Sequence, residues 1–76
     1  MREVEFKMER QGLVHENDKV TIIERYSPSS YYYIIEPAVA MSGCFPQSKR
    51  ITSRVGTVRE IRHTDRGYYV IVVFEE

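Results

Sequence analysis

The last third of the chain predicts two long β-strands joined by a tight turn, and this feature constrains the fold more than any other. Residues 50–62 and 68–75 are rich in Val, Ile and Tyr, which favour strands. Between them, Asp65 and Arg66 suit the centre of a type I turn, and Gly67 suits the left-handed position that follows it. The sequence therefore predicts an antiparallel β-hairpin here.

Two apolar residues on the first of these strands, Val58 and Ile61, lie three positions apart. Side chains of a regular strand alternate between its two faces, so these two residues cannot point to the same side of a regular strand. Either a β-bulge lies between them or both faces of the hairpin are covered. Strong bending of this kind is what the closure of a small barrel requires.

Shorter β-patterns precede this hairpin. Residues 1–10 predict an N-terminal strand, because apolar residues occur at every second position; a helix is the alternative, since the segment contains good helix formers and Val4 with Met8 would suit one. Residues 19–26 and 31–36 predict a second hairpin, whose turn is Ser27-Pro28-Ser29-Ser30. Together with the C-terminal pair, these segments give five strands.

Residues 37–49 lack a strand pattern and are predicted to form a long loop. Pro37 and Gly43 bracket a short apolar stretch, which favours a single helical turn near 37–42. We therefore expect residues 1–76 to form one all-β domain, a five-stranded, strongly bent barrel. Its loop 37–49 is expected to pack back over the domain.

Composition narrows the class of protein. The 76 residues include 11 Lys and Arg against 11 Asp and Glu, which argues against a strongly basic nucleic-acid coat protein. Cys44 is the single cysteine, so no internal disulfide can form. No apolar run approaches the ~20 residues that a membrane span needs, and the N-terminus has no signal-peptide pattern. We therefore expect a cytoplasmic protein with no membrane partner.

The segment Val55–Ile61, followed after the turn by Tyr69–Phe74, resembles the small SH3-like barrel of KOW type. In that family a glycine precedes alternating apolar residues on one strand, and a short hairpin returns. Gly56 corresponds to the family's marker glycine, and its core positions correspond to Val58, Ile61, Val70 and Val72. The resemblance covers about a third of the chain. It implies an SH3-like barrel that binds RNA or proteins of the transcription and translation machinery.

Basic residues gather in one stretch, 49–66, which holds six basic and two acidic residues. Arginine binds phosphate in a bidentate manner and tyrosine stacks on bases, so this stretch is a candidate RNA- or DNA-binding face. The candidate nucleic-acid-binding residues are Arg50, Arg54, Arg59, Arg62 and Arg66. The alternative is a solvated strand face on which Arg59 and Arg62 pair with acidic residues of neighbouring strands.

Two strands carry apolar residues on both faces. In 68–75 and in 31–36, aromatic and aliphatic residues occupy consecutive positions, whereas a single-layer barrel buries only one face of each strand. The other face is covered by the N-terminal strand, by loop 37–49 or by another chain. Tyrosine is favoured at recognition surfaces. The candidate partner-binding residues are Tyr31, Tyr33, Met41, Phe45, Tyr69, Ile71 and Val73.

Catalytic and metal sites are not predicted. His15, His63 and Cys44 lack the spacing of zinc ligands, and the chain has neither a nucleophile elbow nor a Gly-rich phosphate loop. Cys44 is expected to be a packed loop thiol. We predict a non-catalytic interaction module without a cofactor, which binds a protein or itself. KOW-like nucleic-acid binding is the alternative, and a small-molecule pocket under loop 37–49 is a third hypothesis.

Overall fold

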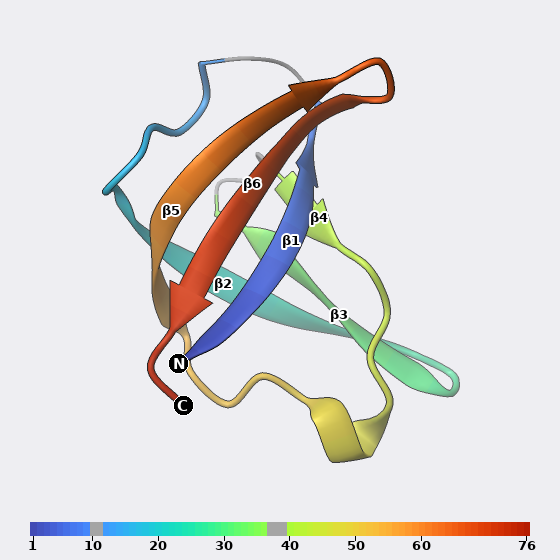
Figure 1. The fold of residues 1–76 in the computed structure, drawn as a ribbon. Coiled ribbons are helices and arrows are strands. Elements are labelled where there is room, and N and C mark those ends of the chain that lie inside the picture. Colours follow the sequence, from blue (N-terminus) through green and yellow to red (C-terminus); the bar gives the residue numbers. More distant parts are fainter. Residues whose placement is uncertain (10–11, 37–39) are drawn as a thin grey trace.

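The computed structural model describes residues 1–9, 12–36 and 40–76 and shows a closed antiparallel β-barrel (Figure 1). The described residues form six strands and one short 3-10 turn, η1 (Gln47–Lys49). The strands are β1 (Arg2–Met8), β2 (Lys19–Ser27), β3 (Ser30–Ile35), β4 (Ala40–Ser42), β5 (Val55–Thr64) and β6 (Gly67–Phe74). The prediction of a small, strongly bent all-β barrel is therefore confirmed.

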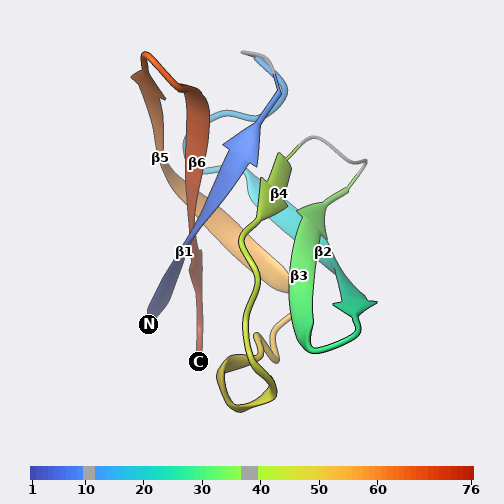
Figure 2. The same ribbon diagram turned by 90° about the vertical axis from the view of Figure 1, so that its right-hand side faces the viewer.

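The strands follow one another around the barrel in the order β1-β4-β3-β2-β5-β6, and β6 closes on β1. β2, β3 and β4 pair consecutively, and β5 and β6 form a hairpin. The segment 43–54 leads from β4 to β5 across one end of the barrel, which is the lower end in Figures 1 and 2. Both ends of the chain lie at this same end.

The strand count differs from the expected five because β4 lies within the predicted loop 37–49. Met41 at its centre is exposed, and both of its neighbours in β4 are buried. Three residues are too few to show a period, so β4 is visible only through its pairing with β1 and β3. The helical turn predicted near 37–42 is wrong for residues 40–42, and residues 37–39 lie outside the described residues. The described part of the chain contains no helix able to span a membrane.

The β5–β6 hairpin has the predicted turn, and of the two alternatives for Val58 and Ile61 it shows the β-bulge. Thr64 pairs with Gly67 across the turn, and Gly67 has a φ of +127°, in the region that favours glycine. The register shifts between Val58 and Glu60, so one extra residue of β5 is accommodated there. Because of this bulge, the apolar side chains three positions apart on β5 both face inward.

The predicted strand 50–62 begins later than expected, at Val55. In the preceding segment, three consecutive backbone N–H groups donate to side chains instead of to a neighbouring strand. The N–H of Ile51 donates to the Tyr33 hydroxyl at 2.9 Å, and the next two N–H groups donate to the carboxylate of Glu76 at 3.0 and 2.8 Å. These three N–H groups are therefore satisfied without β-pairing, and the carbonyl of Arg54 accepts a hydrogen bond from the N–H of Ile22 on β2 at 2.8 Å.

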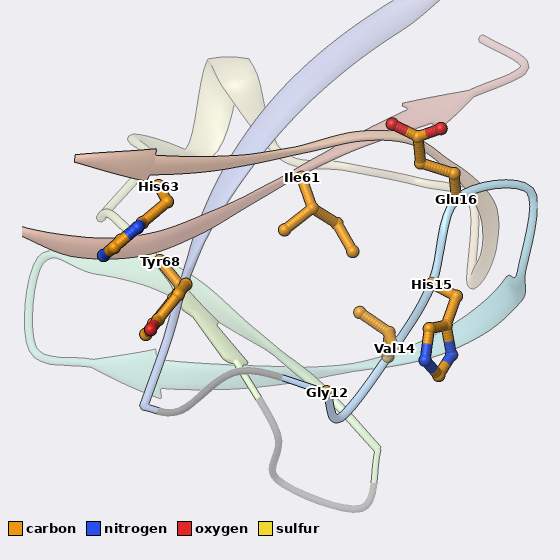
Figure 3. A pocket seen from close by; sticks show the side chains of 7 residues that line it. All are labelled: Gly12, Val14, His15, Glu16, Ile61, His63 and Tyr68. Carbon is orange, nitrogen blue, oxygen red and sulfur yellow. The ribbon is translucent and has the colours of Figure 1, made fainter.

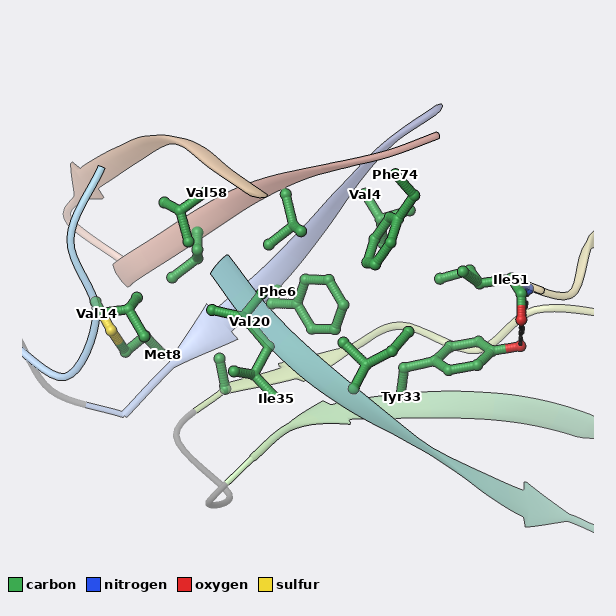
Figure 4. Close-up of a cluster of buried hydrophobic side chains, with 14 residues drawn as sticks. Val4, Phe6, Met8, Val14, Val20, Tyr33, Ile35, Ile51, Val58 and Phe74 are labelled. Atoms are coloured by element: carbon green, nitrogen blue, oxygen red, sulfur yellow. Dashed lines mark hydrogen bonds between the residues drawn. The ribbon is translucent and has the colours of Figure 1, made fainter. Parts of the chain in front are cut away.

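The core fills the barrel with side chains from every strand (Figure 4). Its buried members are Val4, Phe6, Met8, Val14, Val20, Ile22, Tyr33, Ile35, Ala40, Ile51, Val58, Val70, Val72 and Phe74. The apolar positions predicted to alternate in β1 are all among them. No side-chain nitrogen or oxygen in the described residues is buried without a hydrogen-bond partner, as expected for a well-formed core.

Candidate interaction surface

A continuous row of side chains crosses the outer face of the barrel. Directly opposite residues on paired antiparallel strands point to the same side of the sheet. Ile23 is opposite Ile34, Ile34 is opposite Met41, and Lys7 is opposite both Met41 and Tyr69. We call this set the outer row. From β2 to β5 it consists of Ile23, Ile34, Met41, Lys7, Tyr69 and Arg62.

The outer row leaves apolar surface in contact with solvent. Met41 is 52% exposed, and Ile23, Ile34 and Tyr69 are each half-buried. Beside them on the same face, Tyr32 on β3 lies opposite Arg25 on β2. Aromatic side chains, Met and Arg are enriched at the cores of protein–protein interfaces. This face therefore carries residue types that are enriched at such interfaces.

Three of the predicted partner-binding residues are accessible on the outer face. Met41 and Tyr69 belong to the outer row, and Val73 points outward further along β6, opposite Glu3 on β1 and Thr57 on β5. The structure thus brings Met41 and Tyr69 to one surface, on the two strands that flank β1.

The other predicted partner-binding residues are placed differently. Tyr33 is fully buried in the core, and Ile71 on the outer face of β6 is only 5% exposed. Tyr31 and Phe45 form an isolated β-bridge and pack against the core. For Tyr33 and Ile71 the prediction of an accessible binding residue is therefore wrong, because the barrel and its flanking side chains cover them.

Sequence reasoning missed Ile23 and Ile34 as surface residues. Ile23 directly follows the buried Ile22, and Ile34 directly precedes the buried Ile35. Each apolar run therefore includes residues from both faces of its strand. The signal that could have found them is the run of consecutive apolar residues, combined with the strand order that places β2, β3 and β4 side by side.

A polar cluster closes the lower end of the barrel around Glu24. Its carboxylate accepts hydrogen bonds from Arg50 Nε at 3.0 Å and Nη2 at 2.7 Å, and from the Tyr33 hydroxyl at 2.8 Å. The hydrogen bonds from Arg50 hold the pKa of Glu24 below its usual range. Burial and the hydrogen bond to Glu24 raise the pKa of Tyr33. The guanidinium of Arg50 also lies 4.4 Å from the centre of the Tyr31 ring.

The predicted basic stretch is distributed along the barrel and does not form a single patch. Arg50 and Arg54 lie at the lower end and pair with Glu24, while Arg66 lies at the opposite end in the β5–β6 turn (Figure 1). Between them, Arg59 pairs with Glu3 on β1, and Arg62 pairs with Glu60 on its own strand. The pairing of Arg59 agrees with the alternative hypothesis, a solvated face paired with acidic residues of neighbouring strands, whereas the partner of Arg62 lies on the same strand.

Glu76 fastens the segment 50–54 to the barrel. Its carboxylate accepts hydrogen bonds from the backbone of Thr52 and Ser53, and it pairs with Arg2 at 3.2 Å. Burial alone would raise the pKa of Glu76, but the hydrogen bonds from Ser53, Thr52 and Arg2 outweigh it and lower the pKa to about 2.

Replacement of Glu76 is expected to lower the free energy of unfolding and to make that free energy depend less on pH. A carboxyl whose pKa is lowered by folding adds stability above its unfolded pKa, near 4.5, and this stability is lost as the pH falls to about 2. Glu76→Gln should cost about 1.5 kcal/mol at neutral pH, typical of hydrogen bonds to a charged group. Urea unfolding between pH 2 and 7 measures this. The exposed Glu75→Gln serves as control, and equal pH profiles for the two variants would contradict the assignment.

Side chains that commonly ligate metals do not form a cluster within the described residues. Among them, no group of three His, Cys, Asp or Glu side chains is placed to hold a metal ion. Cys44 is a free, exposed thiol, so the prediction that it is packed is wrong. The chain matches no protein-family model, no curated protein and no solved structure. The function proposed below therefore depends on the geometry of the chain itself.

Proposed function

We propose that this protein is a non-catalytic interaction module that binds a protein partner or a second copy of itself through the outer row. The observation that carries the proposal is the exposed apolar side chain of Met41, which Ile34 and Ile23 extend on one side, with Tyr69 beyond Lys7 on the other. Ile23, Ile34 and Met41 form the apolar part of the row, and the charged Lys7 and Arg62 lie on either side of Tyr69. Apolar and aromatic side chains beside charged ones are typical of an interface centre and its rim.

The resemblance to an SH3-like barrel of KOW type is part of this proposal, because members of that family are small barrels that bind RNA or proteins. Gly56 supports it, because this residue lies against the core residues Val72 and Phe74. The sixth strand, β4, goes beyond the five strands that we expected. Because β4 carries Met41 at the centre of the outer row, the proposed binding surface does not depend on the resemblance.

Nucleic-acid binding through the arginines remains the second proposal, with less support. Four of the five candidate arginines are paired with carboxylates in the described chain, which reduces the charge available for phosphate. Binding to RNA or DNA that falls steeply with added salt, and weakens in a variant with Arg62→Ala and Arg66→Ala, would favour this second proposal over the first.

The proposal is tested with two single substitutions on opposite sides of the barrel. Met41 and Val55 are 52% and 54% exposed, but Val55 lies on β5 outside the outer row. Met41→Lys should lower partner retention or self-association by about tenfold or more, as for an interface hot spot. Val55→Lys should leave both unchanged. Neither substitution should unfold the protein, because both side chains are exposed.

The measurements are light scattering over a dilution series and capture from a nuclease-treated extract of the native host. A loss confined to Met41→Lys supports the proposal. Equal behaviour of the wild type and both variants contradicts it, as does a monomer at high concentration that retains no protein. Loss of all bound material on nuclease treatment would instead favour the nucleic-acid proposal.

A further inference from the structure

A pocket of about 550 Å³ opens between the β5–β6 hairpin and the loop that leads into β2, at the end of the barrel opposite the chain termini; Figure 3 shows the residues that line it. Pockets for small molecules in proteins usually occupy ~300–1,000 Å³. None of the lining residues belongs to the outer row. The pocket is therefore a second feature of the surface, independent of the proposed function.

One wall of the pocket is the inner face of the projecting hairpin. Ile61 and Val70 are opposite each other and inward-facing, and His63 and Tyr68 are the opposite pair two positions nearer the turn. They therefore continue the inward face of the sheet past the end of the core. The rings of His63 and Tyr68 are stacked, with centroids 4.3 Å apart and planes 11° from parallel. This pair gives the wall a flat aromatic surface.

The facing wall is the loop that leads into β2, and it is anchored to the barrel. Val14 is buried and belongs to the core cluster. Asn17 N–H donates to the Val58 carbonyl at 2.8 Å, and Val58 N–H donates to the Asp18 carbonyl at 2.8 Å. Figure 3 shows Val14 and Ile61 pointing toward each other between the two walls. The backbone anchoring indicates a pocket that is formed before a ligand binds.

The lining residues determine the class of ligand. Val14 and Ile61 provide an apolar floor and the His63–Tyr68 pair a flat wall, which together suit a planar ring. Glu16 at the rim is an exposed carboxylate, and the lining residues within the described ranges 1–9, 12–36 and 40–76 include no Lys or Arg. From these observations we propose that the pocket binds a small planar aromatic amine, with its ring against Tyr68 and its positive charge toward Glu16.

Two commercial probes with the same bicyclic ring and opposite charges test the proposal, namely tryptamine and indole-3-acetate. Their binding is followed by backbone and methyl NMR of the whole protein. Tryptamine should shift the signals of Val14, Ile61 and Tyr68 with a Kd of about 1 mM, as expected for a ligand of this size in an open pocket. Indole-3-acetate should bind about two- to fivefold more weakly, the effect of one exposed charge.

Substitutions at two exposed residues test the contact with the ring and the contact with the charge separately. Glu16→Gln should remove the preference for tryptamine, and His63→Ala should weaken both probes. Glu75→Gln, which removes a carboxylate outside this pocket, is the control and should change neither affinity. The proposal is overturned if the signals of Val14, Ile61 and Tyr68 do not shift at up to about 10 mM tryptamine. That result corresponds to a binding free energy weaker than about −3 kcal/mol. A preference for tryptamine that persists in Glu16→Gln overturns the assigned role of Glu16.

Discussion

Gly56→Ala is expected to destabilise the barrel more than any other single-methyl change at a glycine. A Cβ at residue 56 would lie 2.5 Å from Val72 Cγ1 and 2.7 Å from Phe74 Cε1. Both neighbours are fully buried, so neither can move aside without disturbing the core. Overpacking of this kind should cost about 3 kcal/mol, a large part of the ~4–11 kcal/mol expected for a chain of this size.

Gly43→Ala is the matched control, because a Cβ at that position meets nothing within 4 Å. It should change the free energy of unfolding by no more than about 0.5 kcal/mol. Urea unfolding followed by circular dichroism measures both variants. In a Gly56→Ala background, Val72→Ala should cost less than it does alone, because it removes the clashing methyl group. Equal stability of the two alanine variants would show that β5 does not approach β6 as closely as described.

Tyr33→Phe should cost about 2 kcal/mol, although it removes only one oxygen atom. The Tyr33 hydroxyl accepts a hydrogen bond from the N–H of Ile51 and donates one to the carboxylate of Glu24. Both Tyr33 and Ile51 are buried, so the backbone N–H would lose its partner where water cannot easily replace it. The loss combines an unsatisfied donor with a weakened charge cluster.

The neighbouring residue supplies the control for this effect. Tyr32 points to the outer face and is half-buried, so Tyr32→Phe should change stability by no more than about 0.5 kcal/mol. Chemical unfolding of the two variants under one set of conditions gives the comparison. If Tyr33→Phe proved as stable as Tyr32→Phe, the hydroxyl would not hold segment 50–54 against the core.

Much of the fold could be predicted because its signals are local. The alternation in β1, the turn at Asp65 and Arg66, and the three-residue spacing of Val58 and Ile61 each depend on a few neighbouring residues, and the structure confirms all three. β4 could not be predicted in this way. It becomes a strand only because β1 and β3 lie on either side of it, which is a non-local condition.

The surface was harder to predict than the fold, for a related reason. A run such as 31–35 shows that both faces of a strand are apolar, but it does not say which face points inward. Tyr33 illustrates this, because its hydroxyl has buried partners in Glu24 and Ile51 that are distant in sequence. The row from Ile23 to Tyr69 likewise depends on the order of the strands around the barrel. Residue types alone do not encode that order.

The central claim, that the outer row is the binding surface, is tested most directly by site-specific photo-cross-linking in the native host. A photoreactive amino acid is placed at residue 41 in one variant and at residue 55 in the other, two positions of nearly equal exposure. We predict protein cross-links, to a partner or to a second copy of the chain, from residue 41 but not from residue 55. No cross-link from residue 41, or the same cross-links from both positions, would contradict the claim.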